Sequence, residues 1–318
     1  MESIWDCVIV GGGAAGLSAG LVLGRARRRT LLIDGGTQSN LPAHGIGGLL
    51  GHDGRPPAEL YEMGRQELAA YPSVEVRSGE VRSGERGDDV FVLTLADGTR
   101  ERTRRVLLAT GMEYRPPAVP GLAELWGRSV FHCPFCHGWE VRDRPLGVLA
   151  RGARAVHSAL LLGGWSDDVV LLTDGPAELE DEDRARLAAA GITVDERQVA
   201  ELVAENGELT AVGFTDGTSL ARTGLLVATT MHQRSALAAQ LGAEVGDPTP
   251  VAQDPVAVDG MYRTAAPGVF AAGDLSVQMP QVAAAVASGS LAAAAVVQSL
   301  LADDHGFANA EGKRHVNA

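Results

Sequence analysis

The stretch that decides the fold covers residues 6–36 and reads DCVIVGGGAAGLSAGLVLGRARRRTLLIDGG. It opens with a continuous apolar run at residues 6–10, which is typical of a parallel strand buried on both faces. Glycines follow at once, then a pattern that predicts a helix to about Arg28, and then a second strand that ends at Asp34. This order of strand, glycine turn, helix and strand predicts a Rossmann-like unit.

The glycine turn has the spacing of a dinucleotide-binding site. Gly11, Gly13 and Gly16 give the pattern G-x-G-x-x-G, and Asp34 stands where an acid would bind a ribose hydroxyl. The start of the helix supplies free N–H groups for a pyrophosphate. The residues that we expect to contact the dinucleotide here are Gly11, Gly13, Ala14, Ala15, Gly16, Asp34 and Gly35.

Composition and charge set limits on the partners. The chain has 318 residues, of which 45% are hydrophobic, enough for two domains with cores of their own. Its net charge of −13 argues against nucleic acid and against an anionic membrane. The N-terminus lacks the layout of a signal peptide, and the apolar run 282–301 is interrupted by small and polar residues, so we expect a buried helix there. We therefore predict a cytoplasmic protein with no membrane and no nucleic-acid partner.

A second β-α-β pattern occupies residues 146–175. Pro116, Pro117 and Pro120 mark a linker before it. Residues 266–274 read as a strand that ends at Gly273-Asp274, and a long alanine-rich helix follows. The predicted fold class is therefore α/β, with two doubly wound Rossmann-like domains, the second inserted into the first.

Two of the three cysteines form a C-x-x-C pair, Cys133-Pro134-Phe135-Cys136. Cys7 lies in a strand-like run and is expected to be a small buried apolar residue. A zinc site would need two further ligands at metal spacing, and an inert structural disulfide is uncommon in a cytoplasmic chain. Both alternatives stay open, but a redox pair is favoured, with no metal.

His137 directly follows the pair and is the candidate general acid/base. A thiol must ionise to react, and a histidine titrates near neutrality, so His137 can take a thiol proton and return it. The alternative is that His137 only caps a turn, and His132 is the second candidate. Phe135 and Trp139 are either a substrate wall or core residues.

The layout resembles the low-molecular-weight thioredoxin reductases over nearly the whole chain. The motifs that carry the resemblance are VIVGGGAAGLSA (8–19), LLATG (107–111), the C-x-x-C, GVFAAGD (268–274) and MPQVAAAVASGSLAA (279–293). The resemblance implies an FAD domain at 1–116 plus 233–318, an inserted domain at 117–232 and a homodimer. It also implies FAD contacts from Ala109, Thr110, Gly111, Gly273, Asp274, Gln281 and Val282, with Asp274 on the ribityl chain.

Two departures from the reductases concern the expected nicotinamide site. The turn reads Ala150-Arg151-Gly152-Ala153-Arg154-Ala155, where the reductases have G-x-G-x-x-A. Asp174 stands where they have a basic cluster for the 2′-phosphate, so the loss of affinity for NADPH should be roughly a hundredfold or more. NADH remains possible, because an acid can accept a ribose hydroxyl.

The sequence C-x-x-C-H-G-W-E at 133–140 resembles the gliotoxin-type and holomycin-type dithiol oxidases, which lack a working NADPH site and pass electrons from FAD to oxygen. The resemblance implies oxidation of a small-molecule dithiol in natural-product biosynthesis or self-protection, with hydrogen peroxide as the second product. It also implies that the substrate attacks Cys133 and that Cys136 is the flavin-proximal thiol. The alternatives are a disulfide reductase that uses NAD(P)H or another donor, and a thiol-sensing flavoprotein without turnover.

Two further segments are candidates for shaping a substrate pocket: residues 41–57 and the tail from Ala302. His44 and His52 lie in the first of them; they either line the flavin side or cap turns, and the second is favoured. Nothing in either segment names a substrate.

Overall fold

The computed structural model describes residues 4–88, 90–276 and 279–306. Contacts divide the chain into two compact units: unit 1 comprises residues 1–39, 58–113 and 231–318, and unit 2 comprises residues 40–57 and 114–230. Strands β7 (Met112–Arg115) and β16 (Thr230–Gln233) pair with each other and carry the chain between the units. Residues 40–57, which we expected in the first domain, are grouped with unit 2, because this segment packs on residues 127 and 136.

Unit 1 is built on a seven-stranded sheet with the order β3-β2-β1-β6-β5-β4, in which β17 also pairs with β6. Strands β3, β2, β1, β6 and β17 run parallel, and β4, β5 and β6 are joined as antiparallel neighbours. Their bounds are β1 (Trp5–Val10), β2 (Thr30–Asp34), β3 (Val74–Ser78), β4 (Val81–Arg86), β5 (Phe91–Leu95), β6 (Arg100–Leu108) and β17 (Val269–Ala271). The parallel part places several strand ends at one edge.

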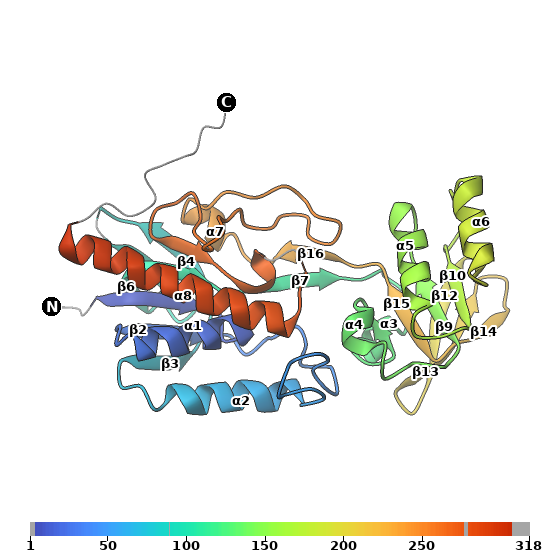
Figure 1. Ribbon diagram of the computed structural model, residues 1–318, viewed down its shortest axis with the longest axis horizontal. Helices are drawn as coiled ribbons and strands as arrows, with labels where there is room; N and C mark the ends of the chain where they lie inside the picture. Colours follow the sequence, from blue (N-terminus) through green and yellow to red (C-terminus); the bar gives the residue numbers. More distant parts are fainter. Residues whose placement is uncertain (1–3, 89, 277–278, 307–318) are drawn as a thin grey trace. The chain divides into compact units, whose positions relative to one another are not determined.

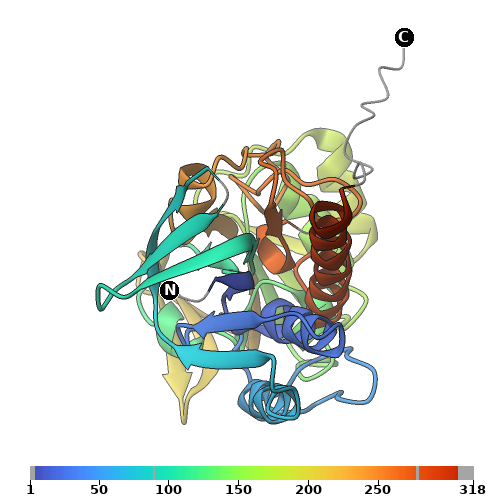
Figure 2. The ribbon, with the colours of Figure 1, turned by 90° about the vertical axis from the view of Figure 1, so that its left-hand side faces the viewer.

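Helix α8 (Val282–His305) lies beside α1 (Ala14–Arg25) in unit 1 (Figures 1 and 2). Gly289 of α8 faces the carbonyl of Ala15 so closely that any Cβ there would overlap it. By length and composition alone α8 could cross a membrane, but half of its apolar window is buried inside the protein, which confirms the predicted buried helix. Residues 307–318 of the expected tail lie outside the described residues. The other helices of this unit are α2 (Pro57–Leu68), α7 (Leu237–Gln240) and the 3-10 turn η1 (Gly273–Leu275).

Unit 2 holds the second Rossmann-like unit (Figure 1). Its five-stranded parallel sheet has the order β11-β10-β9-β15-β8, and α5 (Ala153–Leu162) connects β9 to β10. The strands are β8 (Val130–Phe131), β9 (Leu146–Leu149), β10 (Val169–Leu172), β11 (Thr193–Asp195) and β15 (Gly224–Val227). The unit is completed by α3 (Leu122–Leu125), α4 (Pro134–His137), α6 (Asp181–Ala189) and the antiparallel strands β12 (Val199–Glu205), β13 (Glu208–Phe214) and β14 (Ser219–Ala221). The predicted α/β fold class with two Rossmann-like domains is confirmed.

Candidate functional site

The expected FAD residues gather at the carboxyl edge of the unit 1 sheet. Strand β1 leads into Gly11, β2 ends at Asp34, β6 leads into Ala109 and β17 leads into Gly273. Because β2, β1, β6 and β17 are parallel, these four ends lie on the same edge. This is the edge at which open α/β sheets bind their ligands.

The glycine turn at this edge is shaped for a close backbone approach. Gly11 has a φ of +114°, and a Cβ on it would overlap the carbonyl of Ala109. A Cβ on Gly16 would overlap the carbonyl of Gly11. Gly13 precedes the first residue of α1 and offers no side-chain cap, so the first N–H groups of the helix are left for an anion. The turn therefore fits the pyrophosphate of a dinucleotide.

Asp34 is held in place for a ribose. Its Oδ1 accepts hydrogen bonds from the backbone N–H of Gly36 at 2.9 Å and from Nε2 of Gln38 at 3.0 Å. Arg65 lies 3.7 Å from its Oδ2, and the side chain of Asp34 is largely buried. These contacts keep the carboxylate beside Gly12, at the position the sequence predicts.

The far end of the chain brings the remaining expected FAD residues to unit 1. Asp274 lies in η1, whose first residue Gly273 donates its N–H to Oγ of Ser288 at 2.9 Å. Gln281 is the N-cap of α8, and Val282 is the first residue of that helix. Ser288 was not predicted, because a serine in an alanine-rich helix carries no signal for a contact with a loop.

The C-x-x-C pair forms a short turn in unit 2. Cys133 and Cys136 are joined by a disulfide, with their Cα atoms 5.4 Å apart. The carbonyl of Cys133 accepts the N–H groups of Cys136 and His137, both at 3.2 Å, which closes the single turn of α4. Both cysteines are half-buried.

His137 is fixed by a hydrogen bond and a ring contact. Its Nε2 lies 3.1 Å from the carbonyl oxygen of Gly127, and its ring stacks on Phe131 of β8 with centroids 5.6 Å apart. Its Nδ1 is buried and has no hydrogen-bond partner among the described residues. Burial lowers the pKa of His137 below its ordinary value, while the Gly127 carbonyl and the charge of Glu140 oppose that shift. The side chain is thus neutral near pH 7, with Nδ1 unpartnered inside the fold.

His132, the second candidate for the general acid/base, packs between two aromatic rings. Its ring lies 4.7 Å from the ring of Tyr114 and stacks on Trp126 at 5.6 Å. Burial is the main cause that lowers the pKa of His132 to about 4, and the charges of Arg154 and of His137, once it is protonated, act in the same direction. His132 therefore stays neutral over the physiological range and is a poor proton carrier there.

Two glycines outside the motif, Gly47 and Gly127, lie at or near the redox turn, and neither was predicted. Gly47 lies so close to Cys136 that a Cβ on it would come within 2.7 Å of the Cys136 carbonyl oxygen. Gly127 has a φ of +78°, and a Cβ on it would come within 3.2 Å of Pro42. The 40–57 segment therefore packs against Cys136 through Gly47 and against Gly127 through Pro42. A lone glycine in a loop suggests a turn, but it does not say which residue the turn contacts.

The aromatic residues of the motif are on the surface of unit 2, so the core-packing alternative is wrong for both. Phe135 is 52% exposed and meets the ring of Trp165 edge to face, and Trp139 is 66% exposed. The guanidinium of Arg142 lies 3.8 Å from the centre of the Trp139 ring. Glu140 is exposed and acts on His137 only through its charge.

The two histidines of the 41–57 segment, His44 and His52, make few contacts that bear on the redox turn. Nδ1 of His52 accepts a hydrogen bond from Nε of Arg55 at 3.0 Å, which is a contact between side chains and not a cap on backbone groups. His44 is exposed, and its charge slightly opposes protonation of His137.

The turn at the expected nicotinamide site is crossed by an arginine. Arg151 donates from Nε to the carbonyl of Thr173 at 2.8 Å and from its NH2 group to Oδ2 of Asp174 at 2.9 Å. Oδ1 of Asp174 accepts the N–H of Val199 at 2.9 Å. Both oxygens of the strand-end acid are therefore engaged, and its charge is compensated by Arg151. Arg151 therefore weakens the repulsion that Asp174 alone would exert on a 2′-phosphate.

These residues lack the features with which the reductases hold NADPH. No cationic cluster follows β10, where Thr173, Asp174 and Gly175 stand, and Ala150 replaces the glycine of the tight turn. An exposed ion pair such as Arg151–Asp174 contributes only about 0–1 kcal/mol, so the shape of the turn and the missing cations weigh more than the pair itself.

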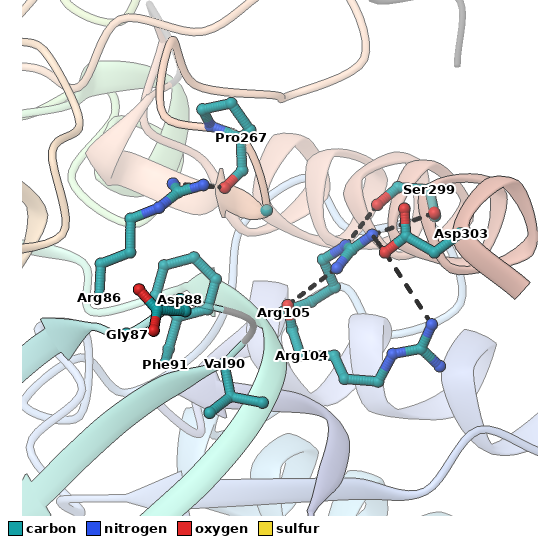
Figure 3. Close-up of a pocket in the computed structure, with 11 residues that line it drawn as sticks. Arg86, Gly87, Asp88, Val90, Phe91, Arg104, Arg105, Pro267, Ser299 and Asp303 are labelled. Carbon is teal, nitrogen blue, oxygen red and sulfur yellow. Dashed lines mark hydrogen bonds and ion pairs between the residues drawn. The ribbon is translucent and has the colours of Figure 1, made fainter. Parts of the chain in front are cut away.

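A pocket of about 260 Å³ lies in unit 1, beside the hairpin of β4 and β5 (Figure 3). Arg105, one of its arginines, turns toward α8 and bonds Ser299 and Asp303 (Figure 3). Arg86, another, donates to the carbonyl of Pro267 at 2.9 Å. Both guanidinium groups bind partners within the protein. Arg105 ties α8 to β6, so we assign this pocket a structural role.

Comparison with known proteins agrees with this arrangement. The family model described as pyridine nucleotide-disulphide oxidoreductase matches residues 5–289. "Thioredoxin reductase tcpT" of Claviceps purpurea is 33% identical over 316 residues, covering 96% of this chain and 97% of the relative. The solved structure titled "Crystal structure of HlmI" superposes with a TM-score of 0.90 at 40% identity, covering 96% of this chain and 95% of that one. An oxidoreductase from Agrobacterium tumefaciens gives a TM-score of 0.88 at 35% identity, covering 94% and 99%.

The family model covers most of the chain, and the relatives match it over nearly their full length. Relatives that carry the name thioredoxin reductase are flavin-dependent disulfide oxidoreductases by that name. The chain therefore belongs to the pyridine nucleotide-disulphide oxidoreductase family and is a thioredoxin-reductase-like, FAD-binding disulfide oxidoreductase.

Proposed function

We propose that this flavoprotein oxidises a small-molecule dithiol to an intramolecular disulfide and passes the electrons to oxygen, in natural-product biosynthesis or self-protection. The observation that carries the oxidative direction is the state of the nicotinamide turn, where Arg151 bonds Thr173 and Asp174 and Ala150 replaces glycine. A reductase needs that site to load electrons from NAD(P)H. An oxidase takes its electrons from the dithiol and does not need it.

The redox turn supplies the thiol chemistry. A substrate thiol gives its proton to Nδ1 of His137, and its sulfur attacks Cys133. The Cys133–Cys136 bond then breaks, and Cys136 leaves as a thiolate. The second substrate thiol gives its proton to the Cys136 thiolate and attacks the substrate sulfur that is bound to Cys133. The bond to Cys133 breaks, the substrate disulfide closes, and Cys133 leaves as a thiolate.

His137 is suited to the proton step because its two nitrogens have different tasks. The Gly127 carbonyl holds a hydrogen on Nε2, so the lone pair is on Nδ1. When Nδ1 takes a proton, the same carbonyl stabilises the imidazolium that results. Burial keeps the ring neutral beforehand, so that it is a base at pH 7.

Residues of unit 1 would hold FAD through the glycine turn, Asp34, Asp274 and the start of α8. When bound, FAD supplies a two-electron carrier that accepts electrons from the reduced cysteine pair and delivers them to oxygen. The overall reaction balances as one dithiol plus one oxygen giving one disulfide plus one hydrogen peroxide.

The test is aerobic turnover with a small dithiol, measured as oxygen consumed and hydrogen peroxide formed. Wild-type protein should give the two in equal amounts, and Cys133→Ser and Cys136→Ser should each abolish turnover, because the relay needs both sulfurs. Cys7→Ala is the control, since Cys7 is fully buried in unit 1 and an alanine leaves no polar group there. Undiminished turnover in either Ser variant would mean that the cysteine pair is not the relay.

A disulfide reductase is the second candidate, because the relatives carry the name thioredoxin reductase. It would run in the opposite direction, from NADH or another donor toward a disulfide. Reduction of the flavin by NAD(P)H at a catalytic rate would favour it.

A further inference from the structure

The loop that follows β2 has little support of its own. Gly35 and Gly36 are consecutive and exposed, and Gly36 has a φ of +71° with nothing within 4 Å of the place where a Cβ would stand. Two glycines in a row give the free backbone many conformations to lose when it becomes ordered. Gln38 must nevertheless stay in place here, because its Nε2 donates to the carbonyl of Gly12 at 3.2 Å and to Oδ1 of Asp34 at 3.0 Å.

Arg234, which directly follows β16, ties this loop down. Its Nη1 donates to the carbonyl oxygen of Thr37 at 2.8 Å and lies 3.1 Å from Oγ1 of the same residue. Its Nε donates to the carbonyl of Met112, the first residue of β7, at 3.0 Å. Because the guanidinium is planar and rigid, the bond to Met112 aims Nη1 at Thr37. All three residues belong to unit 1, and the loop after β2 is thereby joined to residues that lie far from it in the sequence.

The contact is too exposed to contribute much to the stability of the fold. Arg234 and Thr37 both lie on the surface, so the hydrogen bonds between them bury little apolar area and compete with water. Their effect is local: they fix Thr37, which is bonded directly to Gln38, and Gln38 in turn holds Asp34. Asp34 is the acid expected to accept a ribose hydroxyl of FAD. A chain of contacts thus runs from Arg234 to the FAD site.

We propose that Arg234 is a positioning residue for FAD: it orders the loop after β2, so that Gln38 holds Asp34 ready for the ribose of the adenosine half. Arg234 acts through this loop and not through contact with the cofactor. A loop that is ordered before FAD arrives loses less conformational entropy when FAD binds, so the affinity for FAD is higher. This role concerns FAD binding alone and does not depend on which thiol the protein oxidises.

The test is the dissociation constant of FAD, measured from the change in flavin fluorescence as FAD is added to the full chain after its cofactor has been removed. Arg234→Met keeps the apolar stem and removes every donor, and its FAD dissociation constant should rise about tenfold. Arg86→Met is the matched control, because Arg86 is also an exposed arginine of unit 1 that donates to a distant carbonyl, that of Pro267 at 2.9 Å. Its FAD dissociation constant should equal that of wild type.

A double-mutant cycle with Gln38→Leu shows whether Arg234 acts through Gln38. Gln38→Leu should itself raise the FAD dissociation constant about tenfold, and Arg234→Met should then add less than about twofold, since the side chain that the arginine positions has gone. Urea unfolding of each apoprotein should give the midpoint of wild type. An unchanged constant in Arg234→Met, or the full rise in both backgrounds, would overturn the positioning role. So would an Arg234→Met apoprotein that unfolds at a clearly lower urea concentration, because the arginine would then support the fold as a whole.

Discussion

Nε2 of His137 lies 3.1 Å from the carbonyl oxygen of Gly127. Because a carbonyl only accepts hydrogen bonds, Nε2 carries the hydrogen and Nδ1 carries the lone pair. Within the described chain Nδ1 has no partner, and it belongs to the residue that directly follows the reactive cysteine pair. One backbone carbonyl thus selects the nitrogen that can accept a thiol proton.

The pH dependence of flavin reduction should report this histidine. Burial lowers the pKa of His137 from 6.5, and only the neutral ring accepts a proton, so the rate should fall with decreasing pH only below about 6.5. His137→Asn should lower the rate about 100-fold or more and remove this acid limb. The measurement is anaerobic stopped-flow at saturating dithiol from pH 5 to pH 9, with His157→Asn, an exposed residue of α5, as control. An acid limb that survives in His137→Asn would assign the base to another group.

Acid stability should report His132. An unfolded histidine binds a proton near pH 6.5 and His132 in the fold only near pH 4, so between these values the unfolded chain holds more protons. The free energy of unfolding therefore falls as the pH falls through that range. His132→Phe keeps a ring between Tyr114 and Trp126 but cannot titrate, and it should lose about 2 kcal/mol less than wild type between pH 7 and pH 5. Urea unfolding at both pH values measures this, and identical losses in the two proteins would contradict the buried neutral state.

The contact between Gly47 and the redox turn can be tested by one methyl group. Gly47→Ala places a Cβ 2.7 Å from the Cys136 carbonyl oxygen, so the turn or the 40–57 segment must shift. FAD content should stay normal, because the change is in unit 2, while flavin reduction by dithiol should slow about tenfold or more. Gly260→Ala is the control, since a Cβ there meets nothing within 4 Å. A wild-type rate in Gly47→Ala would mean that the segment does not position the cysteines.

Much of the fold could be predicted from the sequence, because local patterns determine it. The buried strands at residues 6–10 and 30–34, the glycine turn between them and the alanine helix from 282 all lie where they were expected. Helix α1 ends at Arg25, earlier than predicted, because Ala26 caps it and Arg27 takes a left-handed φ of +59°. Helix α2 and strands β12–β14 were not predicted, because their charged, half-exposed residues give weak periodicity.

The candidate site was predictable only where its parts are neighbours in the sequence. The cysteine pair and His137 stand together, so they could be named at once. The Gly127 carbonyl, the Gly47 approach and the Arg151–Asp174 pair depend on how separate loops come together in the fold. The Arg151–Asp174 pair matters most for function, because Arg151 neutralises the acid that was expected to repel a 2′-phosphate.

The central claim is that electrons enter from a dithiol and not from NADPH. The most direct measurement is stopped-flow mixing of the oxidised, FAD-loaded protein without oxygen, with a small dithiol in one experiment and with NADPH or NADH in two others. The account predicts that the dithiol bleaches the flavin within one turnover and that NADPH leaves it yellow for minutes. Rapid bleaching by NADPH would contradict the account and restore a thioredoxin-type reductase, and rapid bleaching by NADH alone would point to a reductase in which Asp174 releases Arg151 to hold a ribose.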